Sequence, residues 1–366
     1  MRFELMRHWD YAYECTSLLI QHVNGDSTAG YAASFCDRHG VPLAQVKPLF
    51  VEIEDVERHV LAAVDTTDAA VRKYFRALRA ETGVCAAGLM LSPSPGQDIQ
   101  SHIRDLLAQA PRQRLRWLIQ IIFGYLQTRI VSEEEKDAMG TVQELLRAIF
   151  AEDIADEDKL LLAEMCVSTD TILRALAGLY DRAIGAFRQA EHLLAARLQQ
   201  ALAHLETLID RPGLTVGDFT EGLINAQDNP DGVVHLYPTA MGSYSRSYSL
   251  SFDLEESLYY GINVAALKGL IKEHSSAATH APEILRLLGD ATKQDILRQL
   301  RARRMYGQEL AAALNLSTAT ISYHMNLLIQ QRMVAAERDN SRVYYRLNEE
   351  GLLRALESIR RFLGVE

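Results

Sequence analysis

The chain has 366 residues, of which 48% are hydrophobic and 23% charged, and its formal net charge is −10 at pH 7. This length exceeds the roughly 250–300 residues at which single cores stop growing, so it predicts more than one domain. The composition is ordinary for a soluble globular protein, and no apolar run approaches the roughly 20 residues that span a bilayer. The N-terminus, MRFELMRHWDYAYEC, lacks the uninterrupted apolar stretch of a signal peptide, so we expect a cytoplasmic protein without membrane contact.

Residues 1–275 are predicted to form a helical sensory or dimerisation domain. The segments with apolar residues at helical spacing are 45–64, 69–80, 98–109, 112–130, 133–150, 157–169 and 171–209. The last of them lacks the sustained heptads of a free coiled coil, so we expect the central helix of this domain, with a dimer-spanning helix as the alternative. Four widely spaced cysteines, which form no ligand-like pair, predict buried and reduced thiols: Cys15, Cys36, Cys85 and Cys166.

The pattern changes between residues 232 and 262, where three short β-prone runs predict a small sheet. The runs are 233–237, 248–252 and 258–262. The segment is rich in tyrosine, whose ring offers an apolar face and a polar tip. One interpretation is a pocket for an organic effector, lined by Tyr237, Tyr244, Arg246, Tyr248 and Tyr260. The other is a small sheet that only covers the helical domain, and both remain open at this point.

Residues 276–282 are predicted to be a linker, and 283–366 a second domain with a different charge. Residues 280–366 carry 13 Lys and Arg against 10 Asp and Glu, a net of +3, whereas residues 1–279 carry a net of −13. The acidity of the chain therefore lies outside its C-terminal domain. A basic domain of this kind is suited to contact with nucleic-acid phosphates.

Residues 306–324, YGQELAAALNLSTATISYH, predict two helices on either side of a tight corner, which is the pattern of a helix-turn-helix. Ser317 is a natural N-cap for the second helix. The inner stripe of that helix is predicted to be Ile321, Met325 and Leu328. Its first two turns carry short or hydrogen-bonding side chains, in the part of a recognition helix that reaches base edges.

The residues predicted to read DNA from this helix are Ser317, Thr318, Ala319, Thr320, Ser322, Tyr323 and His324. For His324, a structural role in the helix is an equal alternative. After the helix, β-prone runs at 333–338 and 342–347 flank a turn sequence and predict a hairpin that forms a wing. The residues predicted to contact DNA from the wing are Arg338, Asn340, Ser341 and Arg342. Tyr344 and Tyr345 alternate along the wing, so one of them is expected to face the core.

A last helix is predicted after Asn348, which has the side chain of an N-cap. Its apolar stripe is suited to packing on a second copy of the domain, and consists of Leu352, Leu353, Leu356, Ile359 and Leu363.

Three segments in this order, LGDATKQDILRQL, YGQELAAALNLSTATISYHMNLL and MVAAERDNSRVYYRL, resemble the winged-helix domain of the ArsR/SmtB family of bacterial transcriptional regulators. The resemblance covers residues 286–362. It implies a homodimer that binds a palindromic operator in double-stranded DNA, usually as a repressor, and that a ligand releases. It also implies that the helix after Ser317 enters the major groove.

The resemblance does not extend to the metal chemistry of the family. Metal-responsive members carry Cys-x-Cys-Asp-Leu where this chain has Tyr306, Gly307, Gln308, Glu309 and Leu310. Other members bind metal through histidines and carboxylates of the last helix, but the last histidine of this chain is His324. Because such ions need thiolate or imidazole ligands, we predict no metal site of either family type.

The sequence therefore predicts a mostly α protein, with a helical N-terminal domain, a small β segment near 232–262 and a C-terminal winged helix-turn-helix. The predicted function is a DNA-binding transcriptional regulator, a homodimeric repressor that an organic effector releases. The alternatives are a protein-interaction winged helix or scaffold, and an enzyme with an appended regulatory domain. Because the chain has no nucleotide-binding, metalloprotease or nucleophile-elbow motif, we predict no enzyme, no catalytic residue and no cofactor.

Overall fold

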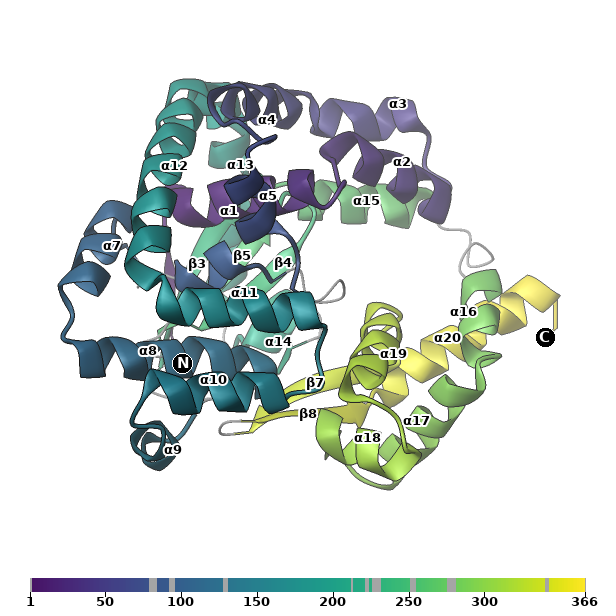
Figure 1. Cartoon of the computed structure of the whole chain (residues 1–366). Coiled ribbons are helices and arrows are strands. Elements are labelled where there is room, and N and C mark those ends of the chain that lie inside the picture. Colours follow the sequence, from purple (N-terminus) through teal and green to yellow (C-terminus); the bar gives the residue numbers. More distant parts are fainter. Residues whose placement is uncertain are drawn as a thin grey trace.

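The computed structural model describes residues 2–78, 84–91, 96–127, 131–211, 213–220, 224–225, 232–250, 255–274, 281–339 and 342–365. Figure 1 shows a large helical domain built around a small sheet, with a C-terminal winged helix beside it. The predicted fold class is confirmed. None of the helices in the described ranges is long and apolar enough to cross a membrane.

The N-terminal domain is organised around one long helix. Its helices are α1 (Tyr11–Val23), α2 (Thr28–His39), α3 (Leu43–Val46), α4 (Val51–Ala63), α5 (Ala69–Phe75), α6 (Ala86–Met90), α7 (Ile99–Ala108), α8 (Pro111–Gln127), α9 (Glu133–Ala138), α10 (Val142–Ala151), α11 (Asp156–Val167), α12 (Thr169–Ala190), α13 (Ala195–Ile209), α14 (Val216–Thr220) and α15 (Val264–His274). Helix α12 packs on α1, α4 and α7 and buries Leu173, Tyr180 and Phe187 in the main core. It is the central helix that the sequence predicts.

Three predicted helices are interrupted in the structure. The segment 171–209 is divided between α12 and α13, which a 3₁₀ turn joins at Glu191–Leu194. The segment 45–64 contains a 3₁₀ turn at Lys47–Leu49, where Pro48 has no backbone N–H to continue the helix. The segment 133–150 is two helices, because the side chain of Thr141 starts α10 by accepting a hydrogen bond from the Glu144 amide at 3.2 Å.

Two helices before residue 45 were not predicted, although their ends carry local signals. The side chain of Asp10 accepts a hydrogen bond from the Tyr13 amide at the start of α1, at 3.0 Å. Ser27 caps α2 in the same way, and Gly40 ends α2 in the left-handed conformation with a φ of 65°. N-cap side chains and a glycine after the last turn are local sequence features that mark the two ends of a helix.

The predicted small sheet exists and has an additional strand from the N-terminus. It contains β1 (Arg2–Leu5), β3 (Val233–Thr239), β4 (Arg246–Leu250) and β5 (Glu256–Gly261), in the order β1-β3-β5-β4. Strand β3 is parallel to both β1 and β5, whereas β4 is antiparallel to β5. Helices α13 and α14 pack on one face of this sheet.

Helix α1 lies on the other face and is fastened there by buried side chains. The rings of Tyr13 and Tyr259 stack with centroids 3.6 Å apart. Glu14 is 1% exposed, and the oxygens of its carboxyl group accept hydrogen bonds from the backbone amides of Ala240 and Met241 at 3.0 and 2.7 Å. A side chain near the N-terminus therefore satisfies two backbone donors at the end of β3.

All four cysteines are free, and three of them are buried as predicted. Cys36 is the exception, because it lies on α2 and is only half-buried.

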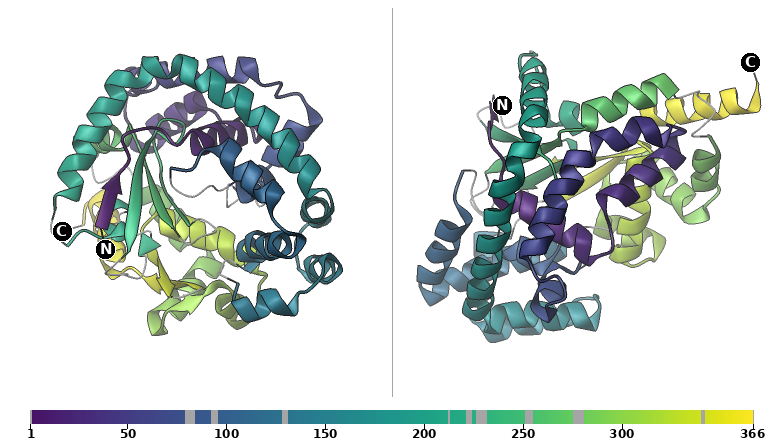
Figure 2. Two further views of the ribbon diagram at one scale, coloured as in Figure 1. Left: turned by 90° about the vertical axis from the view of Figure 1, so that its left-hand side faces the viewer. Right: turned by 90° about the horizontal axis from the view of Figure 1, so that it is seen from above.

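The winged helix has its own core. Its elements are α16 (Ala281–Leu288), α17 (Ala291–Ala302), β6 (Met305–Tyr306), α18 (Gly307–Leu314), α19 (Thr318–Gln330), β7 (Val334–Asp339), β8 (Arg342–Leu347) and α20 (Glu349–Leu363). Helix α16 begins inside the predicted linker 276–282 and contributes Ile284 and Leu287 to the core of the winged helix. The C-terminal end of α20 extends beyond the rest of the domain (Figure 2).

A short strand of the N-terminal domain joins the sheet of the winged helix. Strand β2 (Ile224–Asn225) pairs in parallel with β7, with Ile224 opposite Ala336, and the sheet order is β2-β7-β8-β6. The outer edge of the wing is therefore covered by a segment more than a hundred residues earlier in the chain. The sequence contains no local signal for this pairing, which was not predicted.

Candidate nucleic-acid interface

The corner between α18 and α19 is built by local backbone geometry. Asn315 adopts the left-handed conformation with a φ of 54°, which asparagine tolerates better than most residues. The amide of Leu316 then donates to the carbonyl of Ala311 at 2.9 Å and closes α18. The Ser317 side chain accepts a hydrogen bond from the Thr320 amide at 3.0 Å, so Ser317 is the N-cap of α19 as predicted.

The inner face of α19 packs in the core of the winged helix. This packing determines which face of the helix points outward. Ile321, Met325 and Leu328 have no exposed surface, as the predicted inner stripe requires. On the outer side, Tyr323 is 49% exposed and Ser317 is exposed. The side chains of Thr320 and Ser322 are half-buried. Those of Thr318 and Ala319 lie outside the described part of the chain.

His324 lies mostly below the surface of this face. It is 9% exposed, and its ring centroid is 5.2 Å from that of Tyr323. Burial, and then the charge of nearby Lys293, lower the pKa of His324, which favours the neutral imidazole, although Asp290 acts in the opposite direction. Lys293 is itself held by Asp290 at 2.9 Å. This placement favours the structural role for His324 over contact with a base.

The wing forms at the predicted position. Strands β7 and β8 are antiparallel, and their register runs from Val334 opposite Leu347 to Asp339 opposite Arg342. The pairing places the backbones of Arg338 and Arg342 on either side of the tip. The side chains of these two arginines, together with Asn340 and Ser341, lie outside the described residues.

The tyrosines of β8 divide as expected. Tyr345 packs against the core of the winged helix, where burial raises its pKa. Tyr344 faces the other side, and the guanidinium of Arg304 lies 4.8 Å from its ring centroid. Arg303 donates to Glu309 at 2.9 Å. Arg303 and Arg304, the two cations that follow α17, therefore both have partners within the winged helix.

The predicted five-residue effector pocket is not formed as a group. Tyr237 and Tyr260 are 1% and 4% exposed and lie on opposite faces of the sheet, where Tyr260 packs with Phe219 and Tyr237 stacks on Tyr259. The reason is that side chains alternate along a strand, so proximity in a β-rich segment does not place them in one cavity. Of the four whose side chains the structure describes, Tyr244 and Arg246 line a common cleft, which lies between the two domains. The side chain of Tyr248 is outside the described residues.

The geometry of α18, α19 and the β7–β8 hairpin defines a winged helix-turn-helix protein. A family model described as "Bacterial regulatory protein, arsR family" matches residues 290–336. The chain belongs to this family. Among the described residues, no group of three or more His, Cys, Asp and Glu side chains is placed to hold a metal ion.

Two characterised proteins are similar to this domain. The HTH-type transcriptional regulator KmtR of Mycobacterium tuberculosis is 35% identical over 68 residues, which are 19% of this chain and 52% of KmtR. The transcriptional repressor SdpR of Bacillus subtilis is 31% identical over 65 residues, which are 18% of this chain and 72% of SdpR. The chain thus spans about half the length of the first relative. No solved structure matches the chain significantly.

Proposed function

We propose that this protein is a sequence-specific DNA-binding transcriptional regulator, and that it represses by binding a palindromic operator as a homodimer. The observation that carries the proposal is the outward face of the first turns of α19 beside the wing, in a domain whose core orients both. Residues 293–346 hold 9 Lys and Arg against 4 Asp and Glu, which suits contact with phosphates. The similarity to a transcriptional repressor supports the repressive role.

An exposed apolar face supports the homodimer. Leu353, Leu356 and Leu363 of α20 are 66%, 57% and 60% exposed, and Leu285 of the adjoining α16 is 41% exposed. Leu352 and Ile359, from the same predicted stripe, face the core of their own domain. Exposed leucines on two helices that pack together are typical of an interface, and a second copy would cover them by two-fold symmetry.

The N-terminal domain is the proposed sensory part. Its strand β2 lies along β7, so a movement of this domain would be transmitted to the wing. An organic effector that changes this arrangement would alter the affinity for DNA.

Binding to the DNA upstream of its own gene is expected to be strong and sensitive to salt. Because each neutralised phosphate releases counterions, the affinity should fall by about 10²-fold or more between roughly 50 and 200 mM salt. A mobility-shift titration with the full chain at several salt concentrations measures this. Absence of salt-sensitive binding would favour a protein-interaction winged helix, and substrate turnover by residues 1–275 would favour the enzyme alternative.

Variants of the two predicted contact regions are expected to differ in specificity. Ser322→Ala or Tyr323→Ala should lower the operator affinity by about 1–3 kcal/mol and affect unrelated DNA little, because this helix would read bases. Arg338→Ala or Arg342→Ala should weaken operator and unrelated DNA alike and reduce the salt slope by about 1.

Arg58→Ala is the matched control for these variants. Arg58 is an exposed arginine of α4 in the N-terminal domain, paired with Asp55 at 2.7 Å. Unchanged binding by all four variants of the contact regions would contradict the docking of α19 and the wing on DNA.

A further inference from the structure

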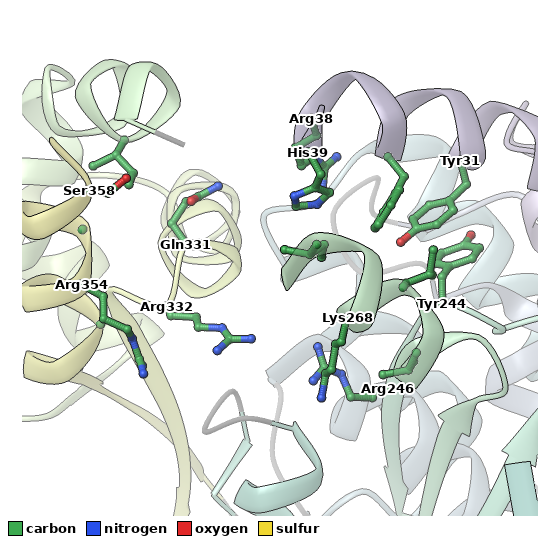
Figure 3. Close-up of a pocket in the computed structure, with 17 residues that line it drawn as sticks. Tyr31, Arg38, His39, Tyr244, Arg246, Lys268, Gln331, Arg332, Arg354 and Ser358 are labelled. Carbon is green, nitrogen blue, oxygen red and sulfur yellow. The ribbon is translucent and has the colours of Figure 1, made fainter. Parts of the chain in front are cut away.

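A cleft of about 510 Å³ lies between the N-terminal domain and the winged helix, and cations occupy both of its walls. Figure 3 shows the two walls facing one another. The basic residues of the N-terminal wall are Arg38 and His39 of α2, Arg246 of β4 and Lys268 of α15. Those of the winged-helix wall are Arg332, which follows α19, and Arg354 of α20. A volume of this size is typical of a site for a small molecule.

The charges of this cleft are of one sign. Among the described residues that line it, none is Asp or Glu. Glu350 pairs with Arg354 at 2.8 Å from one turn earlier on α20, but does not line the cleft itself. Burial, and then the neighbouring Arg246, lower the pKa of Lys268 to about 8. Burial, and then Arg354, lower that of Arg332, whereas Glu350 acts in the opposite direction. Each wall brings like charges close together, and an anion bound in the cleft would stabilise them.

Arg332 is held in a defined position. It has a φ of 57°, and its carbonyl lies so close to Gly351 that a Cβ at that position would come within 1.7 Å of the carbonyl oxygen. Its side chain points across the cleft toward the wall that carries Arg246 and Lys268 (Figure 3). A side chain on a constrained backbone is suited to binding, because little conformational entropy is lost when a ligand binds.

The position of the cleft separates it from the face proposed to read DNA. That face begins at Ser317, whereas Gln331 and Arg332 line the cleft at the opposite end of α19. Because the helix rises about 1.5 Å per residue, Gln331 lies roughly 20 Å along the axis from Ser317 and roughly 12 Å from Tyr323, the last outward residue of that face. The cations of the cleft are therefore placed for a ligand other than the operator.

We propose that this cleft binds a small organic molecule with at least two phosphate groups, which contacts Arg246 and Lys268 on one wall and Arg332 and Arg354 on the other. The planar guanidinium groups match phosphate oxygens in bidentate geometry, and the lysine adds a point charge. The hydroxyl of Ser358 and the amide of Gln331 line the same wall as the two C-terminal arginines. The site is incomplete in either domain alone, so the ligand would join them.

The regulatory consequence of this site rests on the proposed function. A ligand that bridges both walls holds the winged helix in the arrangement in which β2 lies along β7, close to the tip of the wing. In that arrangement the N-terminal domain lies beside the wing that has to approach DNA. Occupancy of the cleft is therefore expected to lower the operator affinity by about tenfold, the usual range of an allosteric coupling.

The test uses calorimetric titration of the full chain with inorganic pyrophosphate, with citrate as an anion of different chemistry. Pyrophosphate should bind with a Kd below about 1 mM and citrate more weakly. Lys268→Gln and Arg354→Gln should each weaken pyrophosphate about tenfold, because each removes a charged donor.

The controls come from the same two helices. Lys272 is exposed on α15 and does not line the cleft, and Lys272→Gln should change the Kd less than about twofold. Arg360 and Arg354 both lie on α20, are 53% and 54% exposed and each pair with a glutamate of that helix, so Arg360→Gln matches Arg354→Gln. Thermal midpoints of all four variants show that they are folded.

The outcomes separate this inference from the proposed function. Equal losses in the control variants, preference for citrate, or a Kd for pyrophosphate above about 1 mM would overturn the cleft as a phosphate site. Operator binding without pyrophosphate binding would leave the proposed function intact and refute this site. Pyrophosphate binding without any DNA binding would support this site and refute the proposed function. If the chain binds both, but pyrophosphate does not change the operator affinity, the regulatory link is refuted.

Discussion

Replacing both Leu353 and Leu356 by Asp is expected to convert the protein into a monomer that binds the operator about 10²- to 10⁴-fold more weakly. In a dimer, binding of the first domain to one half-site holds the second domain at a high effective concentration near the other half-site. A monomer lacks this effect, and its loss lowers the affinity by a factor of this size. The two leucines are 66% and 57% exposed, so the substitutions cost the isolated domain little. In the proposed dimer, however, they would place carboxylates in an apolar contact.

Light scattering and mobility shift measure the two parts of this prediction. The mass should be near 41.0 kDa for the double variant and twice that for the unchanged chain. The matched control is the pair Leu160→Asp and Val167→Asp on α11, where the side chains are 62% and 65% exposed on the N-terminal domain. A double variant on α20 that keeps the mass of a dimer would rule out α20 as the interface.

Glu14→Gln is expected to remove a large pH dependence from the stability of the N-terminal domain. Burial raises the pKa of Glu14 from its ordinary value of 4.5 to about 8, although the amides of Ala240 and Met241 act in the opposite direction. The folded state therefore favours the protonated carboxyl. The stability that this group contributes is fully present below about pH 4.5 and is lost as the pH rises toward about 8.

The expected size follows from the difference between the two pKa values. It corresponds to a decrease of up to about 5 kcal/mol in the free energy of unfolding across this pH range. A glutamine keeps an oxygen that can accept from the two amides but carries no charge. The difference in stability between Glu14→Gln and the unchanged chain should therefore move in favour of glutamine as the pH rises.

Urea unfolding between about pH 5 and about pH 8 tests this. Glu133→Gln is the control, because Glu133 is exposed on α9 and the hydrogen bond from Lys136 lowers its pKa instead of raising it. A constant difference between Glu14→Gln and the unchanged chain at all pH values would show that Glu14 remains ionised in the fold.

The winged helix was the most predictable part of this protein, because its signals are local. Ser317 caps α19 through an amide three residues later, and the turn sequence after Arg338 connects two strands of the predicted lengths. The inner stripe of α19 follows from helical spacing and is fully buried. Each of these features depends on neighbours within a few residues, which the order of residues specifies directly.

The effector pocket was the least predictable part. Tyr237 and Tyr260 fall in one tyrosine-rich segment, yet the sheet turns them to opposite faces. The residues that do line the cleft between the domains come from separate elements, such as Arg38 of α2, Lys268 of α15 and Arg354 of α20. No spacing along the chain indicates that these cations meet.

By itself, the sequence determined the class of the C-terminal domain, its helix-turn-helix, its wing and the mainly helical character of the remainder. Caps, turns and apolar periodicity act over one or two turns of chain, so they can be recognised without knowing the fold. Only the tertiary structure decided that β1 pairs with β3, that Glu14 accepts hydrogen bonds from the amides after β3 and that β2 pairs with the edge strand of the wing. These contacts join residues that are distant in sequence, and their partners are chosen by packing of the whole chain, which no local pattern encodes.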